Sequence, residues 1–204
     1  MAKNYKKTIV FDLDGTLSNF EEIDHIIIDL IYGDSKFVMS LDKFLWKINR
    51  LEILKNSMWV LKFRLIIYSI FSKKRIKKCL NEYRLEYFMR TYNDLRQNYD
   101  SYIYCLKEKY NVRVISNNIF AKGLEYNGMK VFCNTSKIRY LRHLKKRNNI
   151  EYVVGNNLLD DILTGKLTSA KAIYLGKNPF VKFFSTKNFT SLDEVTNYLL
   201  LKSD

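Results

Sequence analysis

Glycine, proline, cysteine and histidine are all scarce in this chain of 204 residues. It contains seven glycines, one proline, three cysteines and two histidines. Two histidines exclude a histidine-rich zinc site. An odd number of cysteines without a C-x-x-C pair favours reduced thiols, so we expect a cytoplasmic protein. Only Gly33 lies between Gly15 and Gly123, and this stretch without further chain breakers is expected to be helical.

Long uncharged apolar runs are missing as well. The most apolar stretch near the middle of the chain is interrupted by Lys62 and Arg64. It is therefore shorter than the about 20 apolar residues that a membrane-spanning helix needs. The opening residues MAKNYKK run directly into an apolar segment, and we expect no signal peptide.

Acidic residues are outnumbered by basic ones, 21 against 35, which gives a formal net charge of +14. Such a charge attracts nucleic acids, anionic membrane surfaces or phosphorylated substrates. No recognised nucleic-acid-binding module is visible, so nucleic acid is not an expected partner. The segments 59–68 and 73–78 join apolar and cationic residues and predict a weak contact with an anionic membrane surface. A solvated basic face would give the same pattern, and both interpretations stay open.

The run T-I-V-F-D-L-D-G-T-L over residues 8–17 is the most informative stretch of the sequence. An apolar strand there delivers Asp12 and Asp14 into a Gly-Thr turn, and alternation along the strand starts both carboxylates on the same side. Paired carboxylates attract a cation, and hard oxygen ligands of this kind suit magnesium. With the metal bound, one carboxylate can attack an electrophile while the other handles a proton.

Short apolar strands alternate with helical patterns on both sides of the glycine-poor stretch. Strands are expected at 8–12, 112–116, 152–155 and 172–175, and helices at 102–110 and 136–148. This alternation predicts an α/β fold with a Rossmann-like parallel sheet and helices on both faces. Ligands bind beyond the carboxyl ends of such strands, where the aspartate pair, Ser116 and the Gly155 turn all fall.

The glycine-poor stretch predicts an inserted α-helical cap at residues 20–100. Apolar residues follow helical spacing over 23–31 and 37–48, and a basic, aromatic helix is expected from about 74 to 97. Residues 1–19 and 101–204 would then form the α/β core domain.

The segment V-F-D-L-D-G-T-L resembles the first motif of the haloacid dehalogenase superfamily of phosphotransferases. The position of the insert is most similar to that in phosphoserine phosphatase-like members with a helical cap. The resemblance implies that Asp12 is the nucleophile that becomes an aspartyl-phosphate. It implies that Asp14 is the general acid and base, and that both aspartates help to hold magnesium. Gly15 and Thr16 of the same motif would contact the substrate.

Two further segments resemble later motifs of that superfamily. The strand V-R-V-I-S-N ends at Ser116, whose hydroxyl can orient a phosphoryl oxygen, and Asn117 would contact the substrate beside it. Lys137 begins the helix S-K-I-R-Y-L-R-H-L and is the expected basic residue that neutralises the nucleophile and the phosphoryl group. Lys130 is its main rival.

The fourth motif departs from the superfamily pattern. In G-N-N-L-L-D-D, Asn156 replaces the usual aspartate, while Asp160 stands at the spacing of the second acid with Asp161 adjacent. An amide oxygen can still bind magnesium but contributes no negative charge. Three explanations stay open: a weaker working metal site, a site rescued by Asp160 or Asp161, or a lapsed enzyme.

The resemblance implies a magnesium-dependent phosphatase that hydrolyses a small phosphomonoester through an aspartyl-phosphate. A dehalogenase would keep the nucleophile but usually lacks a second aspartate in the first motif, so Asp14 argues against it. The alternative from another class is a non-catalytic phosphate-binding or regulatory protein, and Asn156 is its best support.

Overall fold

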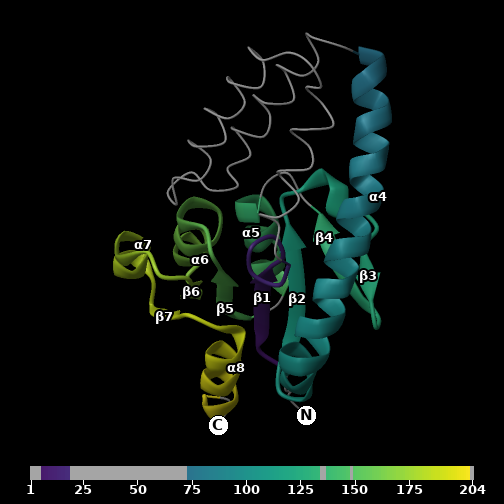
Figure 1. The fold of residues 1–204 in the computed structure, drawn as a ribbon. Helices are drawn as coiled ribbons and strands as arrows, with labels where there is room; N and C mark the ends of the chain where they lie inside the picture. The colour runs from purple at the N-terminus through teal and green to yellow at the C-terminus, as the bar shows by residue number, and fades with distance from the viewer. Residues whose placement is uncertain (1–5, 19–72, 134–136, 148, 203–204) are drawn as a thin grey trace.

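The chain folds around one sheet of mostly parallel strands (Figure 1). The computed structural model describes residues 6–18, 73–133, 137–147 and 149–202. Within these residues, seven strands pair in the order β3-β4-β2-β1-β5-β6-β7, and every neighbouring pair is parallel except β3 and β4. The strands are β1 (Thr8–Asp12), β2 (Asn111–Ser116), β3 (Glu125–Tyr126), β4 (Met129–Cys133), β5 (Ile150–Gly155), β6 (Lys171–Leu175) and β7 (Lys187–Phe189).

Helices connect most of these strands. They are α4 (Lys73–Asn98), α5 (Lys137–Arg147), α6 (Thr164–Leu167), α7 (Pro179–Phe184) and α8 (Leu192–Leu201). Shorter helical turns are η1 (Tyr99–Ile103), η2 (Tyr104–Glu108), η3 (Ile119–Ala121) and η4 (Leu158–Leu163). Figure 1 shows α4 beside the β2–β4 half of the sheet and α7 at the opposite flank. Among the residues that the structure describes, none of the helices is long and apolar enough to cross a bilayer.

Strand β1 lies where the direction of strand addition reverses. After β1 the chain adds β2 and β4 on one side, and then returns past β1 to add β5, β6 and β7 on the other. The connections at such a switch point leave in opposite directions, which opens a crevice at the carboxyl ends of the strands. The fold therefore brings the ends of β1, β2 and β5 to one place.

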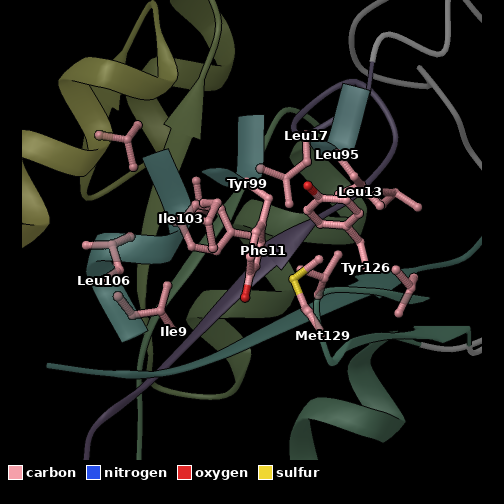
Figure 2. Packing of buried hydrophobic residues seen from close by; sticks show 14 of the residues in the cluster. Ile9, Phe11, Leu13, Leu17, Leu95, Tyr99, Ile103, Leu106, Tyr126 and Met129 are labelled. Carbon is pink, nitrogen blue, oxygen red and sulfur yellow. The ribbon is translucent and has the colours of Figure 1, made fainter. Parts of the chain in front are cut away.

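Alternate residues of β1 pack on opposite faces of the sheet. Ile9 and Phe11 join the largest buried cluster, to which α4, η1, η2 and α8 contribute. Figure 2 shows Ile9 and Phe11 gathered with Leu95, Tyr99 and Leu106 from the helical elements. These side chains are almost inaccessible to solvent, so the hydrophobic effect holds this helical layer against the sheet.

The other face of the sheet carries α5. Val10 of β1 and Val153 of β5 form a second buried cluster with Leu141 and Leu144 of α5. A third cluster joins η4, β6 and α7. Helices therefore cover both faces of a mostly parallel sheet, as the sequence predicts.

All four strands predicted from the sequence are present, and each predicted boundary is within two residues of the observed one. The helices expected at 74–97 and 136–148 are α4 and α5. The helix expected at 102–110 differs, because α4 continues without a break into η1 and then η2. The helices expected over 23–31 and 37–48 lie outside the described residues, and the cap stays a prediction.

Candidate active site

Polar side chains from three strands converge at the switch point of the sheet. Asp12 ends β1, Ser116 ends β2, and Asn156 follows the last residue of β5. Asp14 lies in the turn after β1, which is held by main-chain hydrogen bonds to the carbonyl of Leu13. All four polar side chains are at least nine-tenths buried.

Lys137 binds two of the acidic side chains at this site. It is the first residue of α5, and its ammonium group donates hydrogen bonds to Asp12 Oδ1 and, at 2.6 Å, to Asp161 Oδ1. The side chains of Lys137 and Asp12 are each 7% exposed and that of Asp161 is 1% exposed. Burial and the neighbouring Asp161 carboxylate raise the pKa of Asp12, while Lys137 opposes this rise. The result is a buried triad with one positive and two acidic groups.

Glycine at position 155 makes room for Asp161. A Cβ atom built on Gly155 would lie 2.2 Å from the Asp161 carboxyl carbon, closer than nonbonded atoms approach. The main-chain N–H of Asn157 donates to Asp161 Oδ2 at 2.9 Å. Both oxygens of Asp161 therefore have donors, which fixes the carboxylate facing Lys137.

Asp14 has a different set of partners. Ser116 Oγ donates to Asp14 Oδ2 at 2.5 Å, and the Tyr87 hydroxyl donates to Asp14 Oδ1 at 2.8 Å. The N–H of Asn118 donates to Ser116 Oγ at 2.9 Å, which leaves the Ser116 proton directed at Asp14. Burial raises the pKa of Asp14, and the hydrogen bonds from Ser116 and Tyr87 act in the opposite direction. The two aspartates of the first motif thus occupy distinct electrostatic environments.

The helix α4 is tied to the loop of the first motif, a connection that the sequence analysis missed. Besides the bond from Tyr87 to Asp14, Ser18 Oγ donates to Asp94 Oδ2 at 3.0 Å. Asn98 Nδ2 donates to the carbonyl of Leu17 at 2.7 Å. The sequence predicts a basic, aromatic helix around Tyr87 but does not indicate that this side chain reaches the aspartates. Its buried hydroxyl is the signal that it also needs a polar partner.

Asn156 lies against the turn of the first motif. A Cβ atom on Gly15 would lie 2.1 Å from Asn156 Nδ2, so a larger residue would clash there. Gly15 also has a positive φ of 79°, a backbone conformation that favours glycine. Asn156 Oδ1 is buried and has no hydrogen-bond partner. A buried amide oxygen without a donor is costly unless something else binds it.

This donor set fits a magnesium ion. Across the described ranges, no group of three His, Cys, Asp or Glu side chains is arranged to hold a metal. A hard cation at this position would instead combine the Asp12 carboxylate with the Asn156 amide oxygen and main-chain oxygen, which are ligands that magnesium accepts. The unpartnered Asn156 oxygen is the structural observation that favours this fit.

The remaining predicted site residues differ in their contacts and in their exposure to solvent. Thr16 Oγ1 is 3.5 Å from Asp12 Oδ2, and Asn117 hydrogen-bonds the half-buried Asp160. Burial raises the pKa of Asp160. Lys130, the rival of Lys137, has a 71% exposed side chain on β4, with its ammonium group 4.0 Å from Glu125. The structure therefore brings Lys137, and not Lys130, to the aspartates.

A doubly wound α/β fold with buried acids at its switch point defines a broad class of enzymes and binding proteins. No family model matches this sequence, and no curated protein is significantly similar to it. Solved structures do resemble it. The haloacid dehalogenase-type hydrolase YfnB from Bacillus subtilis, solved with bound magnesium, has a TM-score of 0.59 at 15% identity, over 96% of this chain and 99% of that one.

Two other similar structures represent different activities. A phosphoserine phosphatase, solved as an analogue of its phospho-aspartyl intermediate, has a TM-score of 0.55 at 18% identity, over 95% of this chain and 99% of that one. A 2-haloacid dehalogenase from Pseudomonas syringae pv. Tomato has a TM-score of 0.57 at 14% identity, over 98% and 100% of the two chains. The protein has the fold of the haloacid dehalogenase-like hydrolases, as its first motif predicts.

Proposed function

We propose that this protein is a magnesium-dependent phosphatase that hydrolyses a small phosphomonoester through an aspartyl-phosphate on Asp12. The observation that carries the proposal is the separate pairing of two buried aspartates. Asp12 is held by a lysine, and Asp14 is held by two hydroxyl groups. The first acid is therefore paired with a cation, which favours its ionised form, and the second is paired with neutral hydroxyl groups, beside which it can exist with or without a proton.

Asp12 would act as the nucleophile. Lys137 binds its Oδ1, which leaves Oδ2, near Thr16, to attack phosphorus. Lys137 favours the ionised carboxylate and would neutralise charge on the phosphoryl oxygens. Asp161 would be a positioning residue, because its Oδ1 accepts a second hydrogen bond from the same ammonium group.

Asp14 would act as the general acid and then as the general base. Its raised pKa favours a carboxyl that can give a proton to the leaving oxygen, after which the carboxylate can activate water against the acyl-phosphate. Ser116 and Tyr87 would fix the orientation of this carboxyl. Ser116 would also orient a phosphoryl oxygen of the bound substrate, which Gly15 and Asn117 would contact as well.

Asp12, the main-chain carbonyl of Asp14 and Asn156 would hold the magnesium ion. When bound, such an ion supplies positive charge that offsets the carboxylates and the phosphoryl oxygens. Asp160 stays a candidate ligand at the edge of the site. Asp161 is a weaker candidate, because both of its oxygens already accept hydrogen bonds.

Hydrolysis of p-nitrophenyl phosphate and of a panel of phosphorylated metabolites tests the proposal. We expect turnover that requires magnesium and disappears when a chelator is added, since no other described group supplies a second positive charge beside Lys137. Tight binding of inorganic phosphate without any turnover would contradict the proposal. That result would favour the non-catalytic alternative.

A phosphatase activity fits this chain better than the dehalogenase activity of one similar structure, because the second aspartate of the first motif is present and buried.

The cysteines bear on the compartment in which the protein would act. Cys105 and Cys133 are free thiols, which supports a reducing compartment such as the cytoplasm.

Replacing Asn156 with aspartate is expected to tighten magnesium binding by about tenfold, because a carboxylate adds a full negative charge beside the ion. Without metal, the same substitution adds a fourth acidic group to Asp12, Asp14 and Asp161, so the variant should unfold at a lower temperature in chelator. Magnesium titrations of the hydrolysis rate and thermal unfolding measure the two effects.

Asn156→Ala is the matched control, since it removes the amide oxygen and should weaken magnesium binding, so that a higher magnesium concentration is needed for the same hydrolysis rate. An unchanged magnesium requirement in both variants would exclude Asn156 as a ligand. In that case Asp160 would be the next residue to replace.

A further inference from the structure

The surface of α7 combines exposed aromatic rings with lysines and takes no part in the proposed phosphatase site. Phe183 is 81% exposed and Phe180 is 50% exposed. Large apolar side chains of this size are usually buried, and two of them on one short helix need an explanation.

The helix that carries these rings is anchored to the rest of the fold by its buried residues. Val181 is completely buried and packs with η4 and β6, and Phe184 packs partly against the same cluster. Pro179 begins the helix, and the Asn178 side chain accepts hydrogen bonds from the N–H groups of residues 180 and 181 at 2.8 and 3.4 Å. Both features favour helix initiation at this point. Because the start and the buried face of α7 are fixed, the Phe180 and Phe183 side chains are held in solvent-exposed positions.

The exposed rings also support each other. Phe180 and Phe183 each contact Phe184, with ring centroids 5.2 Å apart in both cases and with T-shaped geometry. Edge-to-face contacts of this kind hold aromatic rings in a defined orientation. The result is a small apolar projection that includes one partly buried ring and two exposed ones.

The chain around α7 has charge of only one sign. Between Asp161 and Asp193 the sequence contains five lysines and no acidic residue. Lys177 and Lys187, on either side of the helix, are exposed, and Lys182 within the helix is half-buried. Exposed lysines before and after an apolar projection are complementary to a surface with dense negative charge and an apolar interior.

We infer that α7 docks this protein on an anionic lipid surface, with Phe180 and Phe183 in the boundary between headgroups and acyl chains and Lys177 and Lys187 against the headgroups. Phenylalanine has no polar atom, so transfer of its ring out of water is favourable in such a boundary. The lysines add an attraction that depends on salt. The inference does not depend on the phosphatase proposal.

Sedimentation of the full chain with vesicles tests the inference. At low salt we expect the protein to pellet with phosphatidylcholine vesicles that contain phosphatidylserine, and not with phosphatidylcholine alone. The double variant Phe180→Ser, Phe183→Ser should bind the vesicles at least about tenfold more weakly, because it loses the favourable transfer of two partly inserted rings out of water. Lys177→Gln and Lys187→Gln should each weaken binding about fivefold.

Leu201→Ser is the matched control, because Leu201 is 79% exposed but lies on α8, and this variant should bind like the original chain. Thermal unfolding of each variant verifies that the fold is intact. Equal pelleting of the double phenylalanine variant would overturn the inference and place any membrane contact elsewhere, as in segment 59–68. Binding to single-stranded RNA without binding to the anionic vesicles would also overturn it.

Discussion

Replacing Asp12 with asparagine is expected to lower turnover by at least about 10⁴-fold, because the nucleophile of the proposed two-step reaction is lost. Asparagine has nearly the same shape, and its amide oxygen can still accept the hydrogen bond from Lys137. The fold should therefore survive. The measurements are the rate of p-nitrophenyl phosphate hydrolysis and the protein mass after rapid quenching with substrate, which reveals one covalent phosphoryl group in the original chain only.

Two other aspartate variants make this result specific. Asp193→Asn changes an exposed aspartate on α8 and should leave turnover unaffected. Asp14→Asn removes the proposed base, so any phosphoprotein that forms should persist longer than in the original chain. Full turnover by the Asp12 variant would contradict the assignment of the nucleophile, whatever the other variants show.

The central strands of this fold could be predicted from the sequence because each is a short apolar run that ends at a polar residue or a glycine. β1, most of β5 and the second half of β2 are buried, and their sequences there are nearly continuous apolar runs. The edge strands β3 and β7 have two and three residues and include exposed positions. Such strands depend on their neighbours for stability, and their own sequences carry little pattern.

The site was predictable where its residues follow a strand directly. Asp12, Asp14 and Ser116 fall at carboxyl ends of strands, and parallel pairing alone brings them together. Tyr87 was not predictable in this way. It lies in the middle of α4, 73 positions from Asp14 in the sequence, and only tertiary packing brings its hydroxyl to the carboxylate.

Asp160 and Asp161 are adjacent in the sequence but make different contacts in the structure. The sequence alone does not indicate which of the two carboxylates faces Lys137. In the structure, the open space above Gly155 admits the Asp161 side chain, which turns toward Lys137, while Asp160 hydrogen-bonds Asn117. The different contacts of the two aspartates thus come from the missing Cβ atom of Gly155 and from the helical turn η4, neither of which composition or periodicity reveals.

Replacing Lys137 with methionine is expected to reduce both turnover and stability. The variant leaves Asp12 and Asp161 buried without their shared cation, and loss of one partner from a buried ion pair costs about 3–5 kcal/mol of unfolding free energy. Turnover should fall by about 10³-fold, since one charged donor to the nucleophile and the phosphoryl group is removed. Urea unfolding and p-nitrophenyl phosphate hydrolysis measure the two losses.

The stability lost in the Lys137 variant should depend on pH in a defined direction. Burial already raises the pKa of Asp12, and removal of Lys137 eliminates a group that opposes this rise. An acid with a raised pKa in the folded state binds protons on folding, so the folded state gains stability as pH falls. The loss of unfolding free energy relative to the original chain should therefore become smaller between neutral pH and about pH 5.

Lys130→Met is the matched control. The Lys130 ammonium group is exposed and lies 4.0 Å from Glu125, so its loss should change the free energy of unfolding by less than about 1 kcal/mol at either pH. Equal effects of the two substitutions would show that the buried triad does not contribute the stability assigned to it.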